Sequence, residues 1–352
     1  MMSNTHFTLR LLNESIALKL PKFALIIILI ICIMIVFMIV WSLNIGSFNL
    51  SFQSVYDTLK GTETDKAANN VVWLFRFPRT LAAILVGIMM ALSGAALQNV
   101  TRNGLADPSL IGISQGAALA VVASIIVFPE IDINLRPWLA LAGSLIVAAT
   151  IQWLSFDDKA SNSLKLILFG IGVSAFLSSI TTAMLTYGDI YNASSALAWL
   201  AGSINATNWF DVKLLSIAVL ILVPLLLILS RLMATLRLGE ISAISLGVPI
   251  KFVKYALISL AVALAAIATS VVGPLGFVGL VAPHLARLLT RSNVAIHLIL
   301  TALIGGLLVL VADFAGRALF APLQIPAGIV TEIIGVPFLI FLLLSQRRKL
   351  NK

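Results

Sequence analysis

The chain has 352 residues, of which 60% are hydrophobic and only 11% are charged, and its formal net charge is +9. A soluble domain has about 25% charged residues, so this composition excludes an ordinary soluble protein and predicts one polytopic membrane domain. The basic residues lie between apolar segments, which sets membrane topology and argues against nucleic-acid binding. The single cysteine, Cys32, lies in an apolar run and has no partner for an internal disulfide.

Apolar windows predict an all-α bundle of about ten transmembrane helices. The first apolar run carries no charge from Phe23 to Leu43 and is followed by no cleavage pattern, so we expect an uncleaved helix and not a signal peptide. The predicted spans are 22–43, 80–100, 109–128, 137–155, 164–186, 212–230, 252–272, 276–290, 295–317 and 327–345.

Lysine and arginine set the predicted orientation. When both termini are placed in the cytoplasm, most of the 23 lysine and arginine residues fall in cytoplasmic segments, as the positive-inside rule requires. We therefore expect a cytoplasmic N-terminal segment 1–21, a transmembrane domain 22–345 and a cytoplasmic tail 346–352.

Two polar segments are predicted on the outer side. Ser42–Asn70 is the longest outer loop, and Tyr187–Asp211 contains a short interfacial helix at Ala196–Gly202. On the other side, Asp107 and Pro108 have the residue types of a helix N-cap and first helical position, so they predict the start of the third span.

The cytoplasmic segment 231–250 is too polar to span the membrane and too apolar for a free loop. Gly239 and Gly247 bracket Glu240–Leu246, which has room for about two helical turns with an apolar edge. Two uses fit such a helix: lying on the bilayer surface, or docking into a groove of a soluble partner.

Motifs of enzyme chemistry are missing from the sequence. There is no phosphate-binding G-x-x-x-x-G-K-[ST] loop and no signature of a catalytic triad. His6, His284 and His297 are scattered, and no Cys/His cluster offers metal ligands. We therefore expect no enzyme activity, no cofactor and no metal site in this chain.

Two acidic residues lie within predicted spans, Asp313 and Glu332. Such residues mark proton or ion pathways. A local ion pair of Asp313 with Arg317, four residues later, is the interpretation we favour over a proton relay.

A cationic motif, Arg76-Phe77-Pro78-Arg79, stands at the outer mouth of the second span. Outer arginines run against the topology bias, which favours a function over plain interfacial anchoring. Planar guanidinium groups suit the carboxylates of an extracytoplasmic partner.

The apolar stretch Gly273–Arg287 is interrupted by three glycines and two prolines. Lipid tolerates broken backbone only where protein or a water-filled cavity covers the freed polar groups. This stretch therefore predicts a helix packed inside a bundle that surrounds a passage. His284, near its cytoplasmic end, has no accompanying ligands and is interpreted as a helix-end contact.

From about residue 71 to 345 the chain resembles the FecCD-type permease subunits of the iron-siderophore and vitamin B12 ABC importers. One departure is Asn103-Gly104-Leu105-Ala106, where the family commonly has Asn-Pro-Leu-Ala. The matching blocks, in order, are Arg76–Arg79, Gly87–Gln98, Arg102–Pro108, Leu110–Ser114, Leu238–Glu240, Ser245–Pro249, Gly273–Arg287, Ala312–Arg317, Ile325–Gly328 and Gly335–Pro337.

The resemblance implies a transport complex in the bacterial inner membrane. Two permease subunits, identical or paralogous, form a pore driven by a cytoplasmic ABC ATPase dimer that hydrolyses the ATP. A periplasmic or lipid-anchored substrate-binding protein delivers a ferric-siderophore complex. The alternatives are cobalamin or haem import by the same architecture, a proton-coupled secondary transporter, and a purely structural membrane scaffold.

The resemblance also implies roles for individual residues. Docking of the binding protein falls on Arg76, Arg79 and Arg317. The pore wall comes largely from the fifth helix, where the small polar residues are Ser174, Ser178 and Thr181. ATPase coupling falls on Gly239, Glu240, Ile241, Ser242, Ala243, Leu246 and Gly247.

Overall fold

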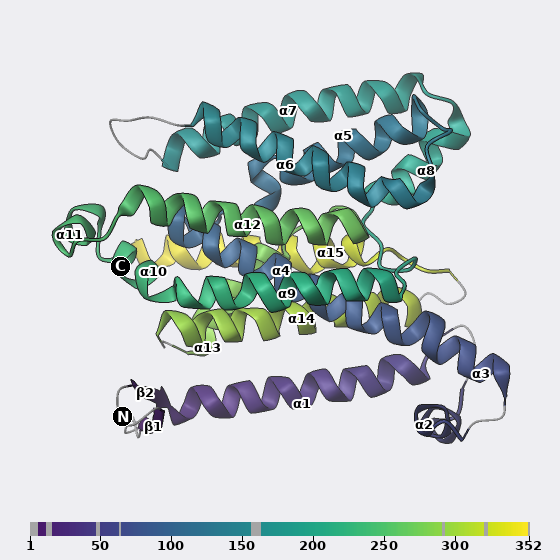
Figure 1. Cartoon of the computed structure of the whole chain (residues 1–352), viewed down its shortest axis with the longest axis horizontal. Helices are drawn as coiled ribbons and strands as arrows, with labels where there is room; N and C mark the ends of the chain where they lie inside the picture. Colours follow the sequence, from purple (N-terminus) through teal and green to yellow (C-terminus); the bar gives the residue numbers. More distant parts are fainter. Residues whose placement is uncertain are drawn as a thin grey trace.

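The computed structural model describes residues 6–11, 16–46, 50–62, 65–155, 163–290, 293–319 and 323–350. It is a bundle of long, roughly parallel and antiparallel helices (Figure 1). In the described residues, eight helices are long and apolar enough to cross a membrane, and two shorter helices are apolar. The long ones are α1 (Lys22–Asn44), α4 (Phe77–Thr101), α6 (Arg136–Leu154), α7 (Ser163–Tyr187), α9 (Trp209–Ile228), α12 (Ile250–Val272), α14 (Val294–Ala318) and α15 (Ala327–Leu350).

The two shorter apolar helices, α5 (Ile113–Ile126) and α13 (Val278–Leu289), account for the remaining predicted spans. Each predicted span therefore falls on a helix, and the all-helical membrane fold is confirmed. The number of crossings and the side on which the termini lie stay predictions. In Figure 1, α1 begins and α15 ends at the end of the bundle where α10 (Ser230–Arg237) and α11 (Glu240–Ser245) lie.

Two segments before α4 have secondary structure that differs from the predictions. Strands β1 (His6–Leu11) and β2 (Ile16–Pro21) form an antiparallel hairpin before α1. The described part of the predicted loop 42–70 contains α2 (Phe52–Lys60) and α3 (Lys66–Asn70), so it is not a plain loop. Side-chain caps explain both helices, because Ser51 Oγ accepts from Ser54 N at 3.0 Å and Asp65 Oδ1 accepts from Ala67 N at 2.8 Å.

The start of the third span is also different from the prediction. Asp107 is an N-cap, as expected, but it caps a single 3₁₀ turn over Pro108–Ile111. Gly112, with φ of 76°, then turns the chain into α5. The predicted interfacial helix exists as α8 (Ile190–Leu200) and begins earlier than expected, because the Asp189 side chain caps it.

Helix α4 lies at the centre of the bundle and packs against α9, α12, α13 and α14. Its contacts depend on paired glycines, because a Cβ on Gly94 would overlap the carbonyl oxygen of Gly279 and a Cβ on Gly87 would overlap that of Gly305. Helices in lipid gain no hydrophobic drive to associate, so small residues that let backbones approach supply the packing.

Helices α5, α6, α7 and α8 form a second group, at the top of Figure 1. Within it, Gly116 of α5 and Gly143 of α6 approach each other as closely as the α4 pairs do. Helix α12 contacts both α4 and α6, which joins the two groups. Helix α1 covers α14 on the opposite side and exposes most of its apolar surface, as a helix facing lipid does.

We predict that Gly94→Ala destabilises the chain by about 1–3 kcal/mol, because the new methyl group forces α4 away from α13. The measurement is the midpoint of thermal unfolding of the purified chain in detergent. The matched control is Gly172→Ala on α7, where a Cβ meets nothing within 4 Å. Equal midpoints for the two variants would contradict the close packing of α4.

Candidate functional site

A buried ion-pair cluster lies near the ends of α4 and α14. Asp313 of α14 accepts from Arg79 Nε at 2.9 and 3.1 Å, and Arg79 Nη2 lies 2.8 Å from its Oδ1. Arg317 Nε lies 3.6 Å from Asp313 Oδ2. The predicted pairing of Asp313 with Arg317 is therefore confirmed, while the stronger contact, to Arg79, comes from a distant part of the chain.

The same cluster holds the end of α1. Arg76 Nη1 donates to the carbonyl oxygens of Leu43 and Asn44 at 2.6 and 2.9 Å. Arg317 donates to the carbonyl and hydroxyl oxygens of Ser42. The last carbonyls of a helix lack intrahelical partners and carry the negative end of its dipole, so two guanidinium groups satisfy and stabilise this helix end.

The three arginines predicted to dock a binding protein thus lie together around Asp313 and the end of α1. Arg76, Arg79 and Arg317 are only 6%, 8% and 6% exposed, and each is engaged inside the chain. Arg79 Nη1 also donates to Asn205 and Gln324 oxygens at 2.5 and 2.9 Å. Docking at these arginines stays a prediction.

The segment predicted to couple to an ATPase forms two short helices, α10 and α11. Gly239, with φ of 114°, and Gly247, with φ of 75°, bracket α11 in conformations that L-residues rarely adopt. The predicted helix is therefore observed between its two glycines. Within α11, the side chain of Ala243 is buried, whereas that of Ile241 is 83% exposed.

The predicted coupling residues thus divide into the buried Ala243 and an exposed group. Ser242, Leu246 and Ile241 are on the exposed side, together with Ile244 and Leu238. The Glu240 side chain lies outside the described residues. An exposed row of isoleucine and leucine on a short helix is the kind of surface that enters an apolar groove.

The candidate pore residues on α7 do not share one surface of this chain. Ser178 is exposed, but Thr181 is 6% exposed and its hydroxyl donates to Leu177 O at 2.9 Å. Ser174 Oγ is buried beside Gly112 and has no hydrogen-bond partner. Pore lining by these three residues stays a prediction.

A cavity of about 430 Å³ lies beside the Gly/Pro break between α12 and α13. Phe277, with φ of 65°, forms part of its wall, and Glu332 of α15 reaches it from the other side. The wall has four further polar residues, which the sequence does not assign to it because only the fold brings them to α15: Asp107, Ser109, Ser114 and Gln115. The broken backbone therefore borders a cavity whose mainly apolar wall includes several polar side chains. That this cavity belongs to a passage stays a prediction.

His284, the remaining candidate side chain, contacts an aromatic ring. His284 packs edge-on against Phe338, with ring centroids 6.0 Å apart. Across the described ranges, no group of three or more His, Cys, Asp or Glu side chains is placed to hold a metal ion.

Comparisons with known proteins agree with this geometry. The pattern of the FecCD transport family matches residues 27–345. The Fe(3+)-citrate import system permease protein YfmE of Bacillus subtilis is 38% identical over 324 residues, which cover 92% of this chain and 96% of that protein. The ferric enterobactin transport system permease protein FepG of Escherichia coli is 33% identical over 310 residues, covering 88% and 93%.

A solved structure shows the same fold. It is an inward-facing metal-chelate type ABC transporter, and it superimposes with a TM-score of 0.80 at 30% identity, covering 91% of this chain and 99% of that chain.

We predict that Asp313→Asn destabilises the chain by about 3–5 kcal/mol, because it leaves buried guanidinium groups without their carboxylate. The measurement is the unfolding midpoint together with the monodisperse fraction in size-exclusion chromatography. Asp132→Asn is the control, since Asp132 is an exposed N-cap and asparagine caps equally well. A midpoint for Asp313→Asn that matches the control would show that the cluster is not needed for stability.

Proposed function

Since the chain belongs to the FecCD transport family and is a multi-pass permease subunit of an ABC importer in the cell membrane, we propose that its cargo is a ferric-siderophore-type chelate. The observation that carries this proposal is the similarity, over nearly the whole chain, to permeases named for ferric citrate and ferric enterobactin. The same relatives favour an iron chelate over cobalamin or haem.

ATP hydrolysis, in this proposal, takes place in a separate cytoplasmic ATPase dimer that docks on α11. The support is the exposed apolar row of Ile241 and Ile244 on a helix fixed between two positive-φ glycines. A protruding helix that contacts α10 and α12 can transmit movement of its partner to both of them. Docking in a groove of the ATPase therefore explains this segment better than resting on the bilayer.

A second permease subunit, a copy of this chain or a paralogue, would complete the passage. The support lies on α7, where small residues such as Ala175 and Ser179 are exposed. Small residues let helices of two subunits approach closely in a membrane. Ser178, on the exposed part of this helix, is the pore-lining candidate that this arrangement favours.

The binding protein would dock at the outer end of the bundle. Asp313 forms ion pairs with both Arg79 and Arg317, so these two guanidinium groups share one carboxylate and leave a surplus of positive charge. Carboxylates of a periplasmic or lipid-anchored protein are attracted by such a surplus. The arginines would act mainly through this field, because their side chains are buried.

We predict that Ile241→Ser lowers association with the ATPase subunit at least tenfold while the permease stays folded, since the side chain is exposed. Co-purification and chelate-stimulated ATP hydrolysis are the measurements. The control, Ile133→Ser, removes another exposed isoleucine, 68% exposed, from the turn that precedes α6. Unchanged association for Ile241→Ser would remove α11 from the coupling interface.

For the cargo, we predict that the complex reconstituted with its binding protein accumulates radiolabelled ferric citrate or a ferric siderophore, and that unlabelled cyanocobalamin does not compete. Competition by cyanocobalamin or by haem, with no accumulation of iron, would overturn the proposed cargo while leaving the importer architecture in place.

A further inference from the structure

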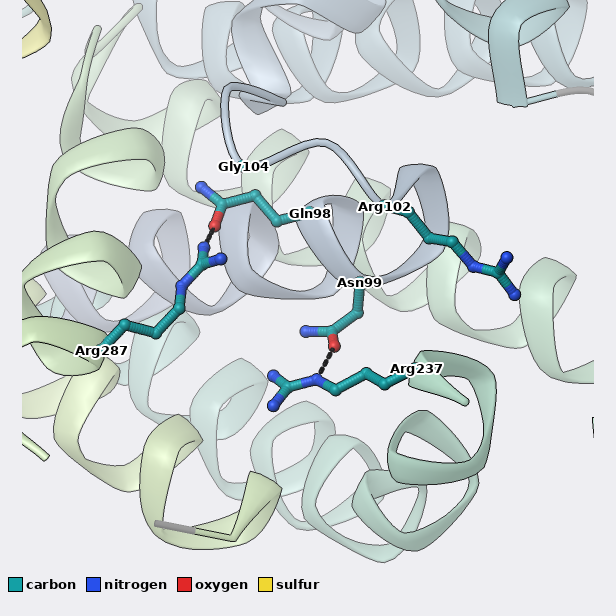
Figure 2. A pocket seen from close by; sticks show the side chains of 6 residues that line it. All are labelled: Gln98, Asn99, Arg102, Gly104, Arg237 and Arg287. Carbon is teal, nitrogen blue, oxygen red and sulfur yellow. Dashed lines mark hydrogen bonds between the residues drawn. The ribbon is translucent and has the colours of Figure 1, made fainter. Parts of the chain in front are cut away.

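Three arginines line a cavity of about 340 Å³ at the end of the bundle that carries α10, and Arg102 points away from Arg287 (Figure 2). Arg102 follows α4, Arg237 is the last residue of α10, and Arg287 lies in the last turn of α13. The rest of the wall is formed by Gln98, Asn99 and Gly104. Three elements that are distant in sequence thus bring their cationic ends to one place.

Two amide side chains of α4 hold two of these guanidinium groups in position. Asn99 Oδ1 accepts from Arg237 Nε at 2.8 Å, and its Nδ2 donates to a backbone carbonyl one turn earlier at 2.7 Å. Gln98 Oε1 accepts from Arg287 Nη2, while its Nε2 donates to Gly279 O at 3.2 Å. Each amide is tied to backbone, so the guanidinium it contacts is held in place before any ligand arrives.

Within the described part of the chain, no carboxylate neutralises the positive charges of this cavity. Arg102 Nη2 donates to Leu236 O at 2.9 Å, and the other contacts of the three guanidiniums go to amide or backbone oxygens. Among the described residues, no carboxylate forms an ion pair with any of them. Burial lowers the pKa of Arg237, yet an arginine stays charged at neutral pH.

The guanidinium groups that line this cavity are suited to bind a phosphate group. A guanidinium presents parallel N–H donors that match phosphate oxygens in pairs. Arg237 uses Nε for Asn99, so both of its terminal nitrogens remain available for an anion. The outer cluster differs, because there Asp313 already occupies the centre.

Apolar side chains follow one of these arginines in the chain and indicate what else the ligand contains. Leu288 and Leu289 come directly after Arg287, and both are exposed. Free phosphate would leave these leucines uncovered. An anionic phospholipid places its headgroup among the arginines and its acyl chains on the leucines.

We propose that this cavity binds the headgroup phosphate of an anionic phospholipid of the cytoplasmic leaflet, such as phosphatidylglycerol. Basic pockets between helices on the cytoplasmic side are where such headgroups bind. The bound lipid would tie the start of the coupling segment, through Arg237, to α4 and α13. The assignment of this cavity to the cytoplasmic side rests on the proposed function. Lipid binding itself does not depend on which cargo the permease carries.

The test is native mass spectrometry of the full-length chain in detergent, titrated with phosphatidylglycerol or with phosphatidylcholine of the same acyl chains. We expect phosphatidylglycerol to be retained and phosphatidylcholine to be lost. Arg237→Gln and Arg287→Gln should each weaken phosphatidylglycerol binding about tenfold, because each removes a charged donor. Arg231→Gln, on the same helix but outside the cavity, is the matched control and should bind as the unaltered chain does.

Two further arms keep the result unambiguous. Arg237→Lys retains charge without the fork, so it should bind with intermediate affinity, and unfolding midpoints in phosphatidylcholine show whether the variants fold. Inorganic phosphate should compete only weakly. Equal binding of both lipids, or equal loss with Arg231→Gln, would overturn the proposal; so would inorganic phosphate binding as tightly as the lipid. Arg237→Gln that loses the ATPase subunit but keeps the lipid would assign the cavity to a protein partner instead.

Discussion

The close approach of α4 to α13 and α14 is the constraint on which the rest of the structure depends. Lipid is as apolar as the helix surfaces, so association rests on backbone contact at small residues. The glycine pairs Gly94–Gly279 and Gly87–Gly305 allow that contact. They also fix the Gly/Pro break before α13, and therefore the cavity with Asp107 and Glu332 in its wall.

The arginines at the two ends of α4 have different kinds of partner. At one end, Arg79 is neutralised by Asp313, and the cluster secures the last turn of α1. At the other end, Arg102 and its neighbours meet amides and backbone oxygens only, within the described part of the chain. A neutralised cluster stabilises the fold, whereas an unneutralised one is available to a ligand.

Sequence predicts the spans because lipid requires long apolar helices. It also predicts the pairing of Asp313 with Arg317, since both lie on one helix. It does not predict Arg79 as a partner, nor the glycine contacts, because these depend on which helices are neighbours. Helices α2 and α3 were missed although Ser51 and Asp65 are recognisable N-caps, since a polar, charged stretch was interpreted as a loop.

The central claim is that this chain forms a passage whose energy comes from a separate ATPase and not from a proton carried on Glu332 or Asp313. The most direct measurement is uptake of a ferric chelate by proteoliposomes that contain the complete complex, with ATP supplied on the side of α10 and α11. We expect uptake that requires ATP, persists with a protonophore and survives Glu332→Gln. Uptake driven by a proton gradient without ATP, and lost in Glu332→Gln, would contradict it.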